Sequence, residues 1–168
     1  MKKMSAFYPL VLGADNPLLR TNCSPVTKFD TELEEFCDTL LALMYEYNWV
    51  GLAAPQIGET IRVIAVTKRE YPSNKKKRRI VGEYIMINPE IIKHTQNTLL
   101  GEEACLSLPG IFGDVKRYSS VTVKYQDSKG KEHIEKLTGY NAIVAQHEID
   151  HINGILFIDK AIGPLRDE

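Results

Sequence analysis

The chain has 168 residues, about the length of one domain, and 43% of them are hydrophobic, which is enough to build a core. Its 21 basic and 22 acidic residues give a net charge of -1, so the charge does not suggest binding to nucleic acid or to an acidic membrane. Three scattered cysteines exclude a disulfide framework, and no stretch has the length and hydropathy of a signal peptide or membrane span. We therefore expect a soluble, cytoplasmic protein with a single domain over residues 1–168.

The first predicted element is a helix over residues 30–47. Its apolar residues recur at helical spacing and form one stripe. Cys37 belongs to this stripe, so core packing explains it. Asp30 or Thr31 is suited to cap the N-terminus, and the acidic residues that follow favour the positive end of the helix dipole.

The middle of the chain changes to strand-like patterns. Residues 61–67 are β-branched and apolar, which predicts a buried strand. Residues 83–92 predict a second strand, one that Pro89 stops. Between them, "REYPSNKKKRR" (69–79) is polar and cationic and predicts an exposed loop.

A hairpin and a helix follow. Residues 119–127 and 132–138 alternate like two paired strands, and Gly130 permits the turn between them. The last predicted helix runs over residues 140–153 and ends at Gly154.

The helix at the end contains "QHEIDH" (146–151). Residues four apart share one helix face, so His147 and His151 point the same way and can bind one divalent ion. Glu148, one step round the helix, can act as a base on a group held by that ion. The alternative is an ordinary solvated helix face. Asp150 faces elsewhere and is interpreted as a supporting or structural residue.

The position of a third metal ligand decides between classes of metalloenzyme. Thermolysin-like peptidases take a glutamate from a following helix, and metzincins take a third histidine; neither pattern follows His151 here. Upstream, Cys105 lies in "GEEACLSLPG" (101–110), which we expect to be a flexible, glycine-flanked segment. A thiolate with two imidazoles would form a tetrahedral site with one open position, although a lone cysteine is more often structural.

A third stretch, "VGLAAPQIG" (50–58), follows the first helix. Its small residues allow a ligand to approach the backbone closely. Gln56 adds an amide whose N–H groups can stabilise an oxyanion. The alternative is a tight turn between helix and strand, and this stretch alone does not separate the two.

Together, the three stretches resemble the peptide deformylase family. That family carries G-x-G-x-A-A-x-Q, E-G-C-L-S and Q-H-E-x-D-H in this order, and the chain has "WVGLAAPQ", "EACLS" and "QHEIDH". The similarity extends to "INPE", "LSLPG" and "HINGILFIDK" and covers most of the chain. The chain departs from the pattern at Trp49 and Ala104, where the family has glycines, and at Phe112, where it often has arginine. These departures bear on substrate range and efficiency.

The resemblance implies an α+β fold, with mixed, mostly antiparallel strands around a central C-terminal helix that carries the motif. It implies a hydrolase that removes the N-formyl group from the N-terminal methionine of new polypeptides and releases formate. Cys105, His147 and His151 would hold one divalent metal ion. Fe(2+) is the expected native ion, and Zn(2+) or Ni(2+) is possible in a crystal.

The resemblance also implies roles around the metal. Glu148 would be the general base and acid, while Gln56 and the backbone N–H of Leu106 would stabilise the oxyanion. Contacts with the bound peptide are expected from Gly51, Ala104 and Trp49.

The expected partners are N-formylmethionyl nascent peptides and, through the basic residues 75–79, the ribosome; no membrane and no specific nucleic-acid sequence are expected. Bacteria, organelles and phages encode such enzymes, so the source stays open. Two rival hypotheses remain. One is a zinc endopeptidase, and the other is an inactive deformylase-like domain that binds nascent chains or ribosomes through the basic loop.

Overall fold

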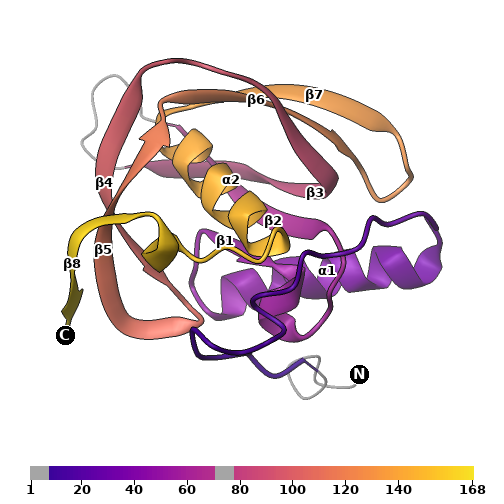
Figure 1. The fold of residues 1–168 in the computed structure, drawn as a ribbon. Helices are drawn as coiled ribbons and strands as arrows, with labels where there is room; N and C mark the ends of the chain where they lie inside the picture. The colour runs from indigo at the N-terminus through magenta and orange to yellow at the C-terminus, as the bar shows by residue number, and fades with distance from the viewer. Residues whose placement is uncertain (1–7, 71–77) are drawn as a thin grey trace.

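Two antiparallel sheets and two long helices form the described part of the chain, residues 8–70 and 78–168 of this computed structural model (Figure 1). The helices are α1 (Thr31–Glu46) and α2 (Gly139–Ile152), with short 3-10 helices η2 (Ala54–Ile57) and η3 (Phe157–Asp159). The strands are β1 (Gly51–Ala53), β2 (Val63–Glu70), β3 (Arg79–His94), β4 (Thr98–Cys105), β5 (Leu108–Tyr118), β6 (Ser120–Gln126), β7 (Glu132–Thr138) and β8 (Ala161–Asp167).

The larger sheet has the strand order β1-β2-β3-β6-β7, and the smaller has the order β4-β5-β8. Every pairing within them is antiparallel. Helix α2 lies at the centre of the molecule between these strands (Figure 1). The predicted α+β fold around a central C-terminal helix is confirmed.

The alternation of side chains on β2 explains why this strand is apolar on both faces. Ile64 and Val66 belong to the core cluster that includes α2 residues, whereas Val63 and Ala65 belong to the cluster that includes α1 residues. Because successive strand residues point to opposite faces, one short strand anchors both helices. The chain therefore sets α2 at a fixed place against the larger sheet.

Helix α1 confirms the first predicted element almost to the residue. Asp30 is its N-cap, and the Asp30 carboxylate accepts a hydrogen bond of 3.0 Å from the backbone N–H of Leu33. The predicted stripe is buried, Cys37 included, except for Leu41, which is half-buried. This cysteine is a core residue, as expected.

Helix α2 also matches its prediction, and it is buried on nearly every side. From Val144 to Ile152 every residue is buried, including the polar ones. A helix surrounded by protein has no solvent face, which accounts for the mixed spacing of its apolar residues in the sequence. The predicted hairpin is present too, as β6 and β7, with Gly130 at φ 82°.

The predicted end of a strand at Pro89 is wrong. Strand β3 continues from Arg79 to His94, through the proline. The pairing of β3 with β6 shifts between Ile87 and Glu90, so Pro89 lies in a bulge where no ladder hydrogen bond is required of it. Asn88, at φ 51°, supplies the unusual backbone conformation there.

Residues 101–110 are also not the flexible segment expected from their glycines. They form the end of β4, a two-residue turn and the start of β5. The predicted loop over 69–79 is shorter than expected, because Arg69 and Glu70 end β2 and Arg79 begins β3. Its central part, including Lys75–Lys77, lies outside the described residues.

Among the described residues, no helix combines the length and the hydropathy needed to cross a bilayer.

Candidate metal centre and pocket

Cys105, His147 and His151 converge on one buried point, although the cysteine lies far from the histidines in the sequence. One ligand atom from each residue, the thiol sulfur or a ring nitrogen, lies within 4.8 Å of the other two. The Cys105 Sγ is 3.3 Å from the Nε2 of His151. The structure thus brings together the three residues that were predicted as ligands.

Two elements carry these side chains. Cys105 is the last residue of β4, directly after a register shift in the β4–β5 pairing that re-aims its side chain. His147 and His151 lie one turn apart on α2, and their rings are 5.0 Å apart. Phe157, from the segment that follows α2, stacks on the ring of His147 and closes one side of the centre.

Glu103 fixes the orientation of His147, a contact that the sequence analysis missed. Its Oε2 is 2.9 Å from the Nδ1 of His147, which leaves the Nε2 of the ring free to face the centre. Arg117 on β5 donates two hydrogen bonds to Glu103, of 2.8 and 2.9 Å, and a third to Asp150 on α2. Asp150 also accepts a hydrogen bond from Lys160. Its predicted supporting role agrees with these contacts.

Glu148 packs against Gly51 at the start of β1, and any residue larger than glycine at that position would collide with its carboxylate. A Cβ placed on Gly51 would lie 2.5 Å from the Oε1 of Glu148. The Oε2 of Glu148 is buried and has no hydrogen-bond partner among the described residues. Burial raises the pKa of Glu148 to about 7. A carboxylate in this state can accept and return a proton near neutral pH.

Gln56 is held so that its amide N–H groups point into the centre. Its Oε1 accepts a hydrogen bond of 2.9 Å from the backbone N–H of Ala53. Its Nε2 donates to the Oγ of Ser107 at 3.2 Å and to the Sγ of Cys105 at 3.7 Å. Leu106 lies in the two-residue turn directly after Cys105. Ser107, like Glu103, was not singled out from the sequence.

The donor set and the charges fit a divalent cation. Burial opposes protonation of His147, but contacts with Cys105 and Glu103 and the charge of Glu148 raise its pKa to about 10. Burial and the charge of His147 lower the pKa of His151. The centre therefore favours positive charge and keeps the imidazole of His151 neutral, and binding of a metal ion would release the proton from His147. One sulfur and two imidazole nitrogens suit zinc, nickel or ferrous iron.

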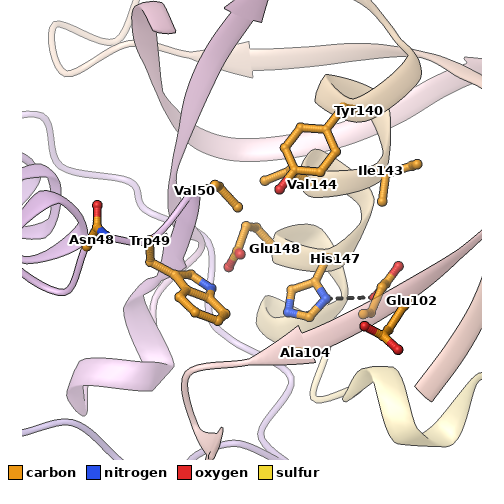
Figure 2. A pocket seen from close by; sticks show the side chains of 11 residues that line it. Asn48, Trp49, Val50, Glu102, Ala104, Tyr140, Ile143, Val144, His147 and Glu148 are labelled. Atoms are coloured by element: carbon orange, nitrogen blue, oxygen red, sulfur yellow. Dashed lines mark hydrogen bonds and ion pairs between the residues drawn. The ribbon is translucent and has the colours of Figure 1, made fainter. Parts of the chain in front are cut away.

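A pocket of about 320 Å³ opens beside the centre, with His147 and Glu148 in its lining (Figure 2). Three elements form its walls: the α1–β1 connection, β4 and α2. Trp49 and Ala104 both line it, whereas Gly51 borders it through its contact with Glu148. The side chains that line the pocket from α2 are Tyr140, Ile143, Val144, His147 and Glu148.

The missed residues had only a weak signal in the sequence. Glu103 is one of two consecutive acids before Ala104, and a buried acid cannot be told from an exposed one by residue type. Glu102 points outward to Arg166, whereas Glu103 points inward to Arg117. Strand alternation would have separated the two, had β4 been predicted as a strand.

Comparison with known families gives one match over nearly the whole chain. The family model described as Polypeptide deformylase matches residues 9–166. Among curated proteins, the peptide deformylase of Thermotoga petrophila is 41% identical over 151 residues, which cover 90% of this chain and 85% of that protein. The peptide deformylase of Mesorhizobium japonicum is 40% identical over 159 residues, covering 95% of this chain and 86% of that protein.

Solved structures agree with these relatives. The crystal structure of peptide deformylase from Thermotoga maritima is similar with a TM-score of 0.81 and 39% identity, over 94% of this chain and 99% of that one. A class I type b peptide deformylase from Acinetobacter baumannii, bound to Met-Ala-Ser, has a TM-score of 0.84 and 34% identity. That similarity covers 93% of this chain and 99% of the Acinetobacter chain.

Proposed function

The chain belongs to the peptide deformylase family, and from this premise we propose how its residues share the reaction. It is a metal-dependent hydrolase that removes the N-formyl group from the N-terminal methionine of newly made polypeptides. We propose that residues 1–168 act as a single domain, which the family match over 9–166 supports. We also propose a cytoplasmic location, because its substrates are new polypeptides.

We propose that Cys105, His147 and His151 hold the metal ion. The convergence of their ligand atoms within 4.8 Å is the observation that carries this proposal. Such an ion, when bound, supplies the Lewis acidity that makes water a useful nucleophile at neutral pH. Fe(2+) is the proposed native ion, because the family resemblance implies it; the same donors also suit Zn(2+) and Ni(2+).

Glu148 moves the proton in the proposed reaction. Its carboxylate takes a proton from the attacking water and returns it to the departing amine, so that formate and a free N-terminus result. The buried, unpartnered Oε2 and the raised pKa support this role.

Gln56 and Leu106 stabilise the charge that develops on the formyl oxygen. The Gln56 amide is preorganised, because Ala53 fixes its oxygen and Ser107 accepts from its Nε2, which also donates to the Cys105 Sγ at the centre. Leu106 would donate its backbone N–H from the turn after Cys105. Loss of one such donor typically lowers the rate by about 10²–10³-fold.

Peptide binding is assigned to Gly51, Ala104 and Trp49. Gly51 and Ala104 lie at the ends of β1 and β4 that border the centre, where an extended peptide could pair with strand backbone. Trp49 lines the pocket beside them. The Acinetobacter relative was crystallised with Met-Ala-Ser bound, which supports the proposal that this chain also binds methionyl peptides.

Formate release from formyl-Met peptides tests the proposed roles. Iron-loaded protein, prepared without oxygen, should release formate and leave the unformylated peptide uncut; cleavage of that peptide would instead favour an endopeptidase. Glu148→Gln should lower kcat by about 10²–10⁴-fold with metal content unchanged. Cys105→Ser should lose the metal, whereas the exposed Glu132→Gln serves as the control. Full formate release by Glu148→Gln would overturn the proposed role of Glu148, whereas an unchanged phenotype of Glu148→Ala in cells that depend on this gene would favour a binding function.

The ribosome remains a proposed partner. Of the basic residues 75–79, Lys75–Lys77 lie outside the described residues. The guanidinium of Arg78 lies 3.6 Å from the ring centroid of Tyr140, at the start of α2. Salt-dependent co-sedimentation with ribosomes, compared between the wild type and a variant with residues 75–79 neutralised, tests this partner.

A further inference from the structure

A lysine outside the metal centre contacts the buried side chains that support it. The Nζ of Lys160 donates a hydrogen bond of 2.9 Å to the Oδ1 of Asp150, on helix α2. The other carboxylate oxygen of Asp150, Oδ2, accepts a hydrogen bond from the Nη1 of Arg117. Lys160 is therefore linked, through two side chains, to the acid that orients His147.

The partner of Lys160 distinguishes this ion pair from an ordinary surface pair such as that of Lys129 with Glu34. The side chains of Lys129 and Glu34 are 72% and 37% exposed. The side chain of Lys160 is 43% exposed, but that of Asp150 is only 11% exposed. Solvent screens the surface pair, whereas a buried carboxylate depends on its partners for its stabilisation. Removal of the charge of Lys160 therefore acts on a buried group.

The charges of this buried network balance only when Lys160 is counted. With the imidazole of His147 neutral, Glu103 and Asp150 carry two negative charges, and Arg117 supplies one positive charge between them. Lys160 supplies the second. Arg117 can therefore use Nη1 for Asp150 and keep Nε and Nη2 for the two oxygens of Glu103. Without Lys160, one guanidinium would have to balance two carboxylates.

The backbone holds Lys160 in place beside α2. Lys160 caps η3, and its N–H donates a hydrogen bond of 3.0 Å to the carbonyl of Phe157. The next residue, Ala161, begins β8 and pairs with Val115 of β5 (Figure 1). Because the 3-10 helix and the strand fix the backbone on both sides, only the side chain of Lys160 must be ordered to reach Asp150.

We propose that Lys160 is a positioning residue for His147. Three buried side chains connect the two residues: Asp150, Arg117 and Glu103. Lys160 balances the charge of Asp150, so that Arg117 stays centred on Glu103 and Glu103 fixes the His147 ring. The inference rests on the proposed function and adds a residue that lies outside both the proposed metal ligands and the pocket lining.

Loss of the charge at Lys160 should loosen the His147 ring. Arg117 would move towards the unbalanced carboxylate of Asp150 and weaken its two-pronged contact with Glu103. Residues that orient a metal-binding histidine typically change metal affinity by about 10–100-fold when they are mutated. Lys160 acts through other side chains, so we expect an effect at the lower end of this range.

Competition between a chelator and the full chain loaded with Co(2+) tests the proposal. Co(2+) bound to a thiolate and imidazoles absorbs visible light, so the titration reports the centre directly. Lys160→Met keeps a long side chain but removes the charge, and it should weaken Co(2+) binding about tenfold. Lys160→Arg keeps the charge and should bind Co(2+) like the wild type. Lys129→Met, which removes a lysine from the surface pair, is the control.

Two further measurements separate positioning from a general loss of stability. With saturating Co(2+), Lys160→Met should lower kcat for formyl-Met-Ala and leave KM unchanged, because Lys160 does not line the pocket. In the background of Asp150→Asn, Lys160→Met should have little further effect on Co(2+) binding, because the two changes break the same connection. If Lys160→Met does not fold, Lys160→Gln carries the comparison.

The two possible failures are distinguishable. Co(2+) binding in Lys160→Met equal to that in Lys129→Met would overturn the role of Lys160 and leave the proposed function intact. An equal loss in Lys160→Arg, or a loss that adds fully to that of Asp150→Asn, would also overturn it. Absence of formate release by the metal-loaded wild type, with the effect of Lys160→Met on Co(2+) binding present, would overturn the proposed function instead.

Discussion

Glu148 depends on the absence of a side chain at Gly51. We predict that Gly51→Ala lowers formate release at least tenfold, because a Cβ there would lie 2.5 Å from the Oε1 of Glu148 and would displace the carboxylate. Overpacking should also reduce the free energy of unfolding by about 1–3 kcal/mol. Gly82→Ala is the matched control, since a Cβ at Gly82 meets nothing within 4 Å. Activity in Gly51→Ala equal to that of the control would contradict this account.

At the scale of single residues, the sequence indicated which side chains converge at the centre, but not the residues that support them. His147, Glu148 and His151 follow from helical spacing alone, because four residues make about one turn. Cys105 was only a candidate until the family resemblance was added. Glu103 could not be identified, because its importance comes from contacts with residues on two other elements.

At the scale of elements, Arg117 joins β4, β5 and α2 through two buried acids. We predict that Arg117→Met costs about 3–5 kcal/mol in the free energy of unfolding, because it removes the shared partner of Glu103 and Asp150. Looser support of His147 should weaken metal retention about 10–100-fold. Denaturant unfolding and metal analysis after dialysis measure the two effects.

Arg166→Met is the matched control for this change. Arg166 also bridges two acids, Glu102 and Asp114, but its side chain is 45% exposed, compared with 3% for Arg117. Solvent screens such a pair, so its loss should cost no more than about 1 kcal/mol. Equal losses in the two variants would show that burial is not what gives Arg117 its importance.

Elements with a clear period were predicted, whereas two strands without one were missed. The stripe of α1 and the alternation of β6 and β7 gave correct elements. Strands β4 and β5 contain glycines, acids and a proline and were missed, because their pairing with each other decides their structure more than local propensity does. The strand was wrongly predicted to stop at Pro89 for the same reason. The bulge that accommodates this proline arises in the pairing of β3 with β6, which the local sequence does not contain.

At the scale of the whole molecule, an ion pair joins the segment before α1 to the segment after α2. Arg20 donates to both oxygens of Asp159, and Asp159 also accepts a hydrogen bond from the N–H of Leu156. Burial opposes ionisation of Asp159, but these contacts lower its pKa below the ordinary value. A lowered pKa stabilises the fold above the ordinary value of about 3.9, and this stability is lost as the pH falls through the lower value.

Asp159→Asn should therefore destabilise the protein only where Asp159 is ionised. Both side chains are about one-third exposed, so we expect a loss of about 0.5–1 kcal/mol at pH 7 that shrinks with added salt and disappears in strong acid. Urea unfolding at neutral and acidic pH measures the difference, with the exposed Asp15→Asn as the control. A loss that persists unchanged in acid would assign the effect to the hydrogen bond with Leu156 instead.

The arrangement of the whole molecule was predicted only through the family resemblance. Periodicity indicated helices at both ends and strands between them, but it contained no information on strand order. The order β1-β2-β3-β6-β7 leaves β4 and β5 in a separate sheet, and that separation brings Cys105 to α2. Such long-range pairings are set by burial across the molecule, which no local window contains.

The centre joins two parts of the chain that are otherwise distant, since Cys105 and His151 are 46 residues apart. An ion held between them would also fasten the β4–β5 hairpin to the last helix, and anything that binds only the folded form stabilises it. A copy that never acquires its ion would therefore open more often and be degraded sooner. The supply of metal in the cell would then control how much of this enzyme survives, as well as how fast each molecule works.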